Sequence, residues 1–233
     1  MNVPERLICI LGMHRSGTSC LTGSLQQAGL HLGQHFKRNP HNLKGNRENP
    51  GFVALNDAVL AANRGAWDFP PRHVSWSDVQ LDRARALLDQ HADHAVVGFK
   101  DPRTLLVLNG WRQLVPHMLR VGIFRHPNAV AQSLVVRSGG EMQWRQCLRL
   151  WYQYNRKLLA EYQRSAFPIL CFDAPEEIFQ SKVDAVSREL GLQPPDGEER
   201  FYSAELRSSD GSLATELPWK VNRLYQRLLR IAY

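Results

Sequence analysis

The sequence contains few cysteines, and no two of them are close together in the chain. The four cysteines stand at positions 9, 20, 147 and 171, and two of them fall in segments expected to form the core. This spacing offers no disulfide framework of the kind that stabilises small secreted domains. We therefore expect reduced, buried thiols in a cytoplasmic protein.

Long apolar runs are also missing. No stretch approaches the roughly 20 apolar residues that a membrane span requires, so we expect no membrane span. The first residues do not resemble a signal peptide, because the apolar run after Arg6 is short and leads directly into a glycine-bracketed loop. There is no internal repeat, and 233 residues are enough for one domain with a substantial core, which we expect to cover residues 1–233.

No recognised nucleic-acid-binding module accompanies the formal net charge of +7. The arginines are spread along the chain instead of forming one tract, so an anionic cofactor or substrate is a better interpretation than nucleic acid. The nine histidines do not form a metal-site pattern either. His31 and His35 lie in a segment broken by glycine and proline, and we expect no metal.

Apolar segments of strand length alternate with segments of helical period along most of the chain. This alternation predicts an α/β fold in which helices flank a central parallel sheet in three layers. Residues 30–94 fit this alternation less well, and we expect them to form a helical and looped lid that lines the acceptor pocket. The predicted strands cover residues 7–11, 95–99, 119–124 and 167–172, and the main predicted helices lie near 78–91, 141–164, 175–190 and 218–231.

A glycine-bracketed loop, Gly12–Ser19, connects the first predicted strand to a helix. At such a turn the backbone N–H groups and the positive end of the helix dipole hold an anion. The nucleotide-hydrolase form of this P-loop has Lys directly before Ser or Thr. Here Thr18 follows Gly17, and the loop cation is Arg15. The loop is therefore P-loop-like and suited to a phosphate-like group, but poorly equipped for ordinary ATP chemistry.

Basic residues also follow the second and third predicted strands. Lys100 and Arg103 come after the second strand, and Arg125 comes after the third, with Ser133 and Arg137 farther along the next helix. Ligands of open parallel sheets bind beyond the carboxyl ends of the strands. Three cationic strand ends at one edge predict a site for an anionic ligand.

These motifs resemble those of the sulfotransferases, whose donor is 3′-phosphoadenosine 5′-phosphosulfate. In that family a basic-Ser-Gly-Thr loop after the first strand holds the 5′-phosphosulfate, and His14–Ser19 matches it. A second family motif places an Arg at a strand end and a Ser eight residues later around the 3′-phosphate, and Arg125 and Ser133 have that spacing. The segment Phe99–Arg103 is similar to bacterial members.

The resemblance implies sulfuryl transfer from this donor to a hydroxyl or amine of a small-molecule or carbohydrate acceptor, without a metal. Arg15 and Lys100 are expected to stabilise the charge that develops during transfer. Glu48 is the expected general base. The donor-binding residues implied by the resemblance are His14, Arg15, Ser16, Gly17, Thr18, Ser19, Arg125 and Ser133.

The general base has more than one candidate. Cytosolic members of the family use a His shortly after the second strand, but Lys100 is followed here by Asp101 and Pro102. Other members use a Glu after the first helix, the region of Glu48. Asp57 and His14 are the other candidates, whereas Asp101 is expected to pair with Arg103 or to orient Lys100.

Two other functions fit parts of the pattern. A divergent P-loop kinase would use Asp101 or Asp173 to organise magnesium, but it leaves Arg125 and Ser133 unexplained. The second alternative function is that of a non-catalytic protein that binds an anionic nucleotide. Trp67, Phe69 and Trp76 either stack on an acceptor ring or pack the lid against the core, and packing is the preferred interpretation.

Overall fold

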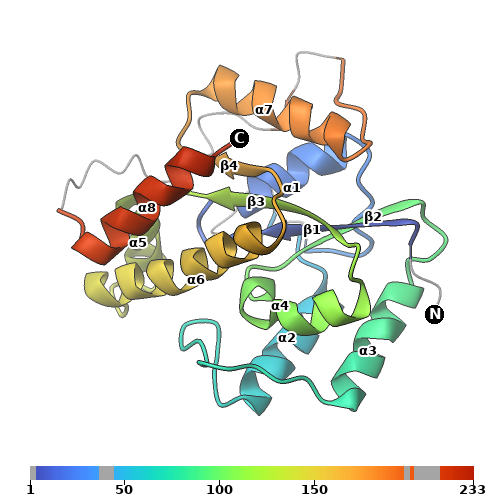
Figure 1. Cartoon of the computed structure of the whole chain (residues 1–233), viewed down its shortest axis with the longest axis horizontal. Helices are drawn as coiled ribbons and strands as arrows, with labels where there is room; N and C mark the ends of the chain where they lie inside the picture. Colours follow the sequence, from blue (N-terminus) through green and yellow to red (C-terminus); the bar gives the residue numbers. More distant parts are fainter. Residues whose placement is uncertain (1–3, 37–44, 197–199, 202–215) are drawn as a thin grey trace.

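A parallel sheet of four strands forms the centre of the computed structural model, which describes residues 4–36, 45–196, 200–201 and 216–233 (Figure 1). The strands lie in the order β2-β1-β3-β4. In the register of the sheet, Arg6 of β1 is opposite Val96 of β2, and Ile8 is opposite Leu119 of β3. The strands are β1 (Arg6–Leu11), β2 (Val96–Lys100), β3 (Leu119–Phe124) and β4 (Ile169–Cys171).

Helices cover both faces of this sheet and complete the three predicted layers (Figure 1). Helices α1 (Thr18–Gln27) and α7 (Glu176–Glu189) pack on one face. The opposite face carries a larger group of helices. They are α2 (Pro50–Ala62), α3 (Asp78–Asp89), α4 (Thr104–Leu114), α5 (Pro127–Arg137), α6 (Trp144–Arg164) and α8 (Trp219–Ile231).

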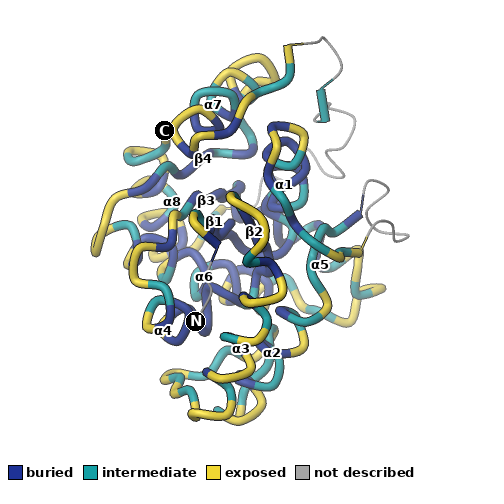
Figure 2. The backbone as a smooth tube through the Cα atoms, turned by 90° about the vertical axis from the view of Figure 1, so that its right-hand side faces the viewer, coloured by how far each residue is buried: buried dark blue, intermediate teal, exposed yellow. Residues whose placement is uncertain are grey.

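Strand β1 is buried on both faces because its side chains alternate between the two helical layers. Leu7, Cys9 and Leu11 pack with the larger helical group, whereas Ile8 and Ile10 pack with α1 and α7. Figure 2 shows this central strand region largely as buried backbone. A continuous apolar run is the expected pattern for a strand covered on both sides, and the α/β prediction is confirmed.

Helix α4 was not predicted from the sequence pattern. Apolar residues fill every position from Leu105 to Leu108, and all four are buried. An amphipathic period is therefore absent from the first half of the helix. The backbone also leaves helical geometry at Val107, where φ is −115° and ψ is 15°.

The predicted insertion at residues 30–94 contains helices α2 and α3. The Asn49 side chain caps α2 by accepting a hydrogen bond of 2.9 Å from the Gly51 N–H, and Ser77 and Gln80 form a reciprocal capping box on α3. Residues 37–44 of the expected lid lie outside the described residues. The role of the insertion as a lid over an acceptor remains a prediction.

Membrane spans and disulfides do not occur in the part of the chain that the structure describes. No helix there combines the length and hydropathy needed to cross a membrane. None of the four cysteines forms a disulfide; Cys171 is partly exposed and the other three are buried.

Candidate functional site

The loop after β1 requires glycine where it turns into α1. Gly17 has a φ of +86°, and a Cβ at this position would lie 2.3 Å from Cδ2 of Phe172. Its lack of a side chain leaves the first turn of α1 without a side-chain cap. A helix N-terminus without a side-chain cap and with close backbone approach suits an anion. Arg15 also has a positive φ, of 66°, within the same loop.

Lys100 at the end of β2 is buried, and it brings together two predicted site residues. Its Nζ donates to Glu48 Oε1 at 2.8 Å and to Ser19 Oγ at 3.3 Å. The Lys100 side chain is 1% exposed and that of Glu48 is 12% exposed. Burial lowers the pKa of Lys100, and the Glu48 carboxylate acts against this by favouring the charged form.

Asp101 forms the expected pair with Arg103, at 2.8 Å. Its other carboxylate oxygen accepts a hydrogen bond of 2.8 Å from Asn56 Nδ2. Burial raises the pKa of Asp101, while the Arg103 guanidinium lowers it. Asp57, a candidate base, lies 2.6 Å from Arg103 Nε, so this carboxylate is also held by Arg103.

The loop after β1 and helix α5 are joined by a hydrogen bond between Arg15 and Ser133. Arg15 Nε donates to Ser133 Oγ at 2.7 Å. Burial, together with the nearby positive charges of Arg137 and Arg125, lowers the pKa of Arg15 to about 10. The two sequence motifs therefore meet in one strongly positive region.

Arg125 at the end of β3 is held by a carboxylate and an aromatic ring. Its Nε lies 3.3 Å from Asp173 Oδ1, and its guanidinium carbon is 5.3 Å from the centre of the Phe172 ring. Asp173 Oδ2 also accepts from the backbone N–H of His126 at 2.6 Å. The role of Asp173 as a partner of Arg125 was not predicted, although its place just after the fourth strand is the signal that marks the other site residues.

His14 is buried in the loop, with no hydrogen-bond partner for Nε2 among the described residues. Its ring centre lies 4.7 Å from that of Trp67 and 6.0 Å from that of Tyr154. Burial lowers the pKa of His14 well below its usual value, and nearby Arg103 and Lys100 act in the same direction. The imidazole is therefore neutral. The buried Ser16 Oγ likewise has no partner in the described part of the chain.

The three aromatic residues expected to pack or to stack differ in their surroundings. Trp76 packs against the core, with its Nε1 donating to the Val107 carbonyl at 3.0 Å. Trp67 is partly buried against the same core, and its carbonyl accepts from the Tyr154 hydroxyl at 2.8 Å. Phe69, by contrast, is 72% exposed.

Chemically, the edge of the sheet offers concentrated positive charge, a helix N-terminus without a side-chain cap, and one carboxylate beside the buried lysine. The structure brings His14–Ser19, Glu48, Lys100, Arg125 and Ser133 to this edge, through the contacts described above. No cluster of His, Cys, Asp or Glu that suits a metal ion occurs among the described residues. The arrangement is suited to binding a polyanion and to stabilising charge on it.

Comparisons with known proteins identify the fold. No protein-family model and no curated protein sequence matches the chain. The structure is similar to the sulfotransferase domain of the Synechococcus PCC 7002 olefin synthase, with a TM-score of 0.63 and 16% identity over 98% of this chain and 96% of that one. It is also similar to sulfotransferase STF1 from Mycobacterium tuberculosis H37Rv, with a TM-score of 0.51 and 17% identity over 97% of this chain and 77% of that one. The chain therefore has the sulfotransferase fold that its motifs led us to expect.

Proposed function

We propose that this chain is a sulfotransferase that moves a sulfuryl group from 3′-phosphoadenosine 5′-phosphosulfate to a hydroxyl or amine of a small-molecule or carbohydrate acceptor. The observation that carries the proposal is the 2.7 Å hydrogen bond between Arg15 and Ser133. It joins the two motifs that, by resemblance, hold the two ends of this donor. The shared fold adds support. None of the four cysteines forms a disulfide, which supports a reducing compartment, the cytoplasm, as the place of the activity.

Arg125 and Ser133 are the residues that would select the donor by its 3′-phosphate. Arg125 is 3% exposed and lies against Asp173, so its guanidinium is fixed in orientation. Charge-assisted hydrogen bonds from a guanidinium to a phosphate are about twice as strong as neutral ones. ATP has no 3′-phosphate and would gain nothing from this contact.

Arg15 and Lys100 would stabilise the transferring group. As the bond from sulfur to the bridging oxygen breaks, its electron pair remains on the phosphate of the leaving nucleotide while the acceptor atom bonds to sulfur. Preorganised cations at this point lower the barrier, because they need no reorganisation during the reaction. Burial keeps the Lys100 ammonium away from water. Because the dielectric constant is lower there than in water, its charge acts more strongly on a nearby anion.

Glu48 is our choice of general base for the acceptor proton. Its carboxylate lies 2.8 Å from Lys100 Nζ, so a base and a stabilising cation are adjacent at the site. Asp57 also pairs with a cation, Arg103, but its side chain is 47% exposed, against 12% for Glu48. His14 is neutral, but its Nε2 is enclosed by protein, which leaves Glu48 better placed to receive a proton.

The divergent-kinase alternative is less well supported. It requires an available strand-end carboxylate, but Asp101 is occupied by Arg103 and Asn56, and Asp173 by Arg125 and the His126 N–H. Neither carboxylate is free to organise a metal ion and its nucleotide.

Calorimetry with adenosine 3′,5′-bisphosphate tests the proposal. The bisphosphate should bind without magnesium, and more tightly than 5′-AMP. Arg125→Ala should weaken the binding of the bisphosphate by about 10-fold to 150-fold, which corresponds to the loss of one or more charged hydrogen bonds. The affinity for 5′-AMP should be nearly unchanged. Ser133→Ala should act in the same direction.

Arg149→Ala is the control, because it removes an exposed arginine of α6 and thus changes the formal charge by the same amount as Arg125→Ala. Magnesium-dependent ATP binding that ignores the 3′-phosphate would overturn the sulfotransferase proposal. Tight bisphosphate binding without turnover of any acceptor would instead favour the non-catalytic nucleotide-binding alternative.

A further inference from the structure

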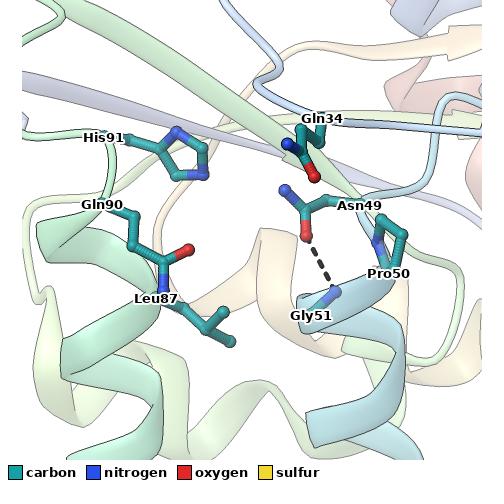
Figure 3. Close-up of a pocket in the computed structure, with 7 residues that line it drawn as sticks. All are labelled: Gln34, Asn49, Pro50, Gly51, Leu87, Gln90 and His91. Atoms are coloured by element: carbon teal, nitrogen blue, oxygen red, sulfur yellow. Dashed lines mark hydrogen bonds between the residues drawn. The ribbon is translucent and has the colours of Figure 1, made fainter.

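A cavity of about 310 Å³ lies between the start of α2 and the end of α3. We call it the α2–α3 cavity. Figure 3 shows His91, Gln90 and Leu87 on one side of this space, and Gln34, Asn49, Pro50 and Gly51 on the other. Its volume is at the small end of the range for sites that bind small molecules.

The polar groups of the α2–α3 cavity have hydrogen-bonding capacity to spare. Among the described residues, the side chains of Gln34 and Gln90 and the ring of His91 have no hydrogen-bond partner. Asn49 uses its side-chain Oδ1 to cap α2, and its side-chain N–H groups remain able to donate to a ligand. Gln34 and Gln90 are exposed and therefore hydrated, so a ligand that enters the cavity must replace this water with donors and acceptors of its own.

His91 is fixed in place although it makes no hydrogen bond through its ring. It is 8% exposed, and a Cβ on Gly33 would lie 2.2 Å from its Cε1, so only glycine permits this approach. The ring also packs near Phe52 and His31, with centre distances of 6.4 Å and 5.9 Å. Burial lowers the pKa of His91, with a further contribution from His94. The imidazole is thus neutral, with one nitrogen as donor and the other as acceptor.

The walls define the chemistry of the ligand. Among the described residues no Lys, Arg, Asp or Glu lines the α2–α3 cavity, so a charged ligand would find no counter-charge in these walls. Three carboxamides and one neutral imidazole each offer donors and acceptors, which suits several hydroxyl groups close together. Leu87 and Pro50 add a small apolar surface. An aliphatic ligand would leave the amides unpaired, at a cost for each.

We propose that the α2–α3 cavity binds an uncharged, polyhydroxylated group such as a saccharide ring, and that this group belongs to the acceptor. The second half of this statement rests on the proposed sulfotransferase function. Asn49 directly follows Glu48, so one short segment carries both a wall of the cavity and the general base. The neutral saccharide would be held at Asn49 while the hydroxyl to be sulfated reaches Glu48.

Nuclear magnetic resonance of the ¹⁵N-labelled full chain, without donor, tests the cavity. Methyl α-glucoside and cellobiose at millimolar concentrations should shift the side-chain amide signals of Gln34, Asn49 and Gln90. Glucuronate and hexanol, a charged and an apolar probe, should shift them far less. Gln34→Leu and Gln90→Leu should each weaken the response to saccharide about fivefold to tenfold.

Both substitutions replace solvent-accessible side chains that have no partner in the described structure, so the fold should tolerate them. Gln146→Leu on the exposed side of α6 is the matched control and should leave saccharide binding unchanged. No shift at the cavity amides, equal affinity in the leucine variants, or a preference for hexanol would each overturn the proposal. Because donor is absent, failure here leaves the bisphosphate test of the sulfotransferase function intact, and the reverse also holds.

Discussion

At the scale of single residues, Lys100 depends on Glu48 for its charge. A buried ammonium has lost its hydration, and its attraction to a carboxylate offsets that loss only while the pair is intact. In the structure, the Lys100 ammonium donates to Glu48 and to the Ser19 hydroxyl. A bound anionic donor would supply a second negative group to the same cation.

Glu48→Gln should therefore lower the stability of the ligand-free protein. Removing one partner of a buried pair leaves an uncompensated charge, and we expect a loss of about 2 to 3 kcal/mol, or about 4 to 12 °C in Tm. Adenosine 3′,5′-bisphosphate should raise the Tm of the variant more than that of the wild type, because the ligand replaces the missing negative charge. Thermal unfolding with and without the bisphosphate measures both effects.

Asp82→Asn is the control for this comparison, since Asp82 pairs with Arg85 on an exposed part of α3. An exposed pair contributes about 0 to 1 kcal/mol, so little change is expected with or without ligand. Equal ligand-induced shifts in wild type and Glu48→Gln would contradict the dependence of Lys100 on Glu48.

Sequence reasoning identified most of these residues but not how they pair. The strand-end rule and the two motifs located Arg15, Lys100, Arg125 and Ser133 without any structure. The pairing of Lys100 with Glu48, and of Arg15 with Ser133, joins residues far apart in the chain, and neither periodicity nor local spacing contains that information. Asp173 was noticed only as a possible magnesium ligand, because its contact with Arg125 depends on β4 lying beside β3.

At the scale of elements, the side chain of Asn56 connects α2 to β2 and α4. Its Nδ2 donates to Asp101 Oδ2 at 2.8 Å and to Thr104 Oγ1 at 3.1 Å, and its Oδ1 accepts from Trp111 Nε1 at 2.9 Å. All four side chains are buried. One amide therefore satisfies three polar groups that have lost their contact with water.

Asn56→Leu keeps a similar volume and removes these hydrogen bonds. We expect a loss of about 3 kcal/mol in the free energy of unfolding, because a buried carboxylate oxygen, an indole N–H and a hydroxyl lose a partner together. Urea unfolding measures the change.

Asn222→Leu on the exposed face of α8 should stay within about 0.5 kcal/mol of wild type. A loss at position 56 no larger than that at position 222 would show that the buried network contributes little to stability.

The pattern of elements was predictable where one face of a helix differs from the other or where a strand is apolar throughout. The third strand has the predicted limits, and α6 begins at Trp144, three residues after the predicted start at Glu141. Helix α4 was not predicted, because its buried first half has no polar face and its sequence therefore lacks the helical period of apolar and polar residues. Burial on nearly all sides comes from the packing of α2, α3 and α6 around it, and only the folded chain shows that packing.

At the scale of the whole molecule, several histidines are kept neutral. Burial is the main cause of the lowered pKa of His14, His31, His91 and His126. In the unfolded chain these groups bind protons near pH 6.5. Below that pH the unfolded state binds more protons than the folded state does, so these histidines make stability fall as the solution is acidified.

His14→Gln isolates the largest expected contribution. The free energy of unfolding of the wild type should fall more steeply between pH 7 and pH 5 than that of the variant, by up to about 1.4 kcal/mol per pH unit. Comparing the two slopes cancels the opposite contribution of Asp101, whose raised pKa favours the folded state in acid.

Urea unfolding at a series of pH values gives the slopes. His117→Gln removes an exposed imidazole as the control and should follow the wild-type slope. Parallel curves for wild type and His14→Gln would mean that His14 takes up its proton equally well in the folded and unfolded states.

The position of β1 in the sheet affects how the protein is made on the ribosome. β1 is synthesised first, but its neighbours in the sheet come from residues 96–100 and 119–122. Both sides of an apolar strand therefore stay unpaired for seconds during translation, a period in which nascent chains are prone to aggregate and depend on chaperones. The loop Gly12–Ser19 is complete in sequence soon after β1, yet Ser133, which accepts its hydrogen bond from Arg15, emerges later still. Affinity for an anionic ligand should consequently arise late and abruptly during synthesis, at the moment when the centre of the sheet closes.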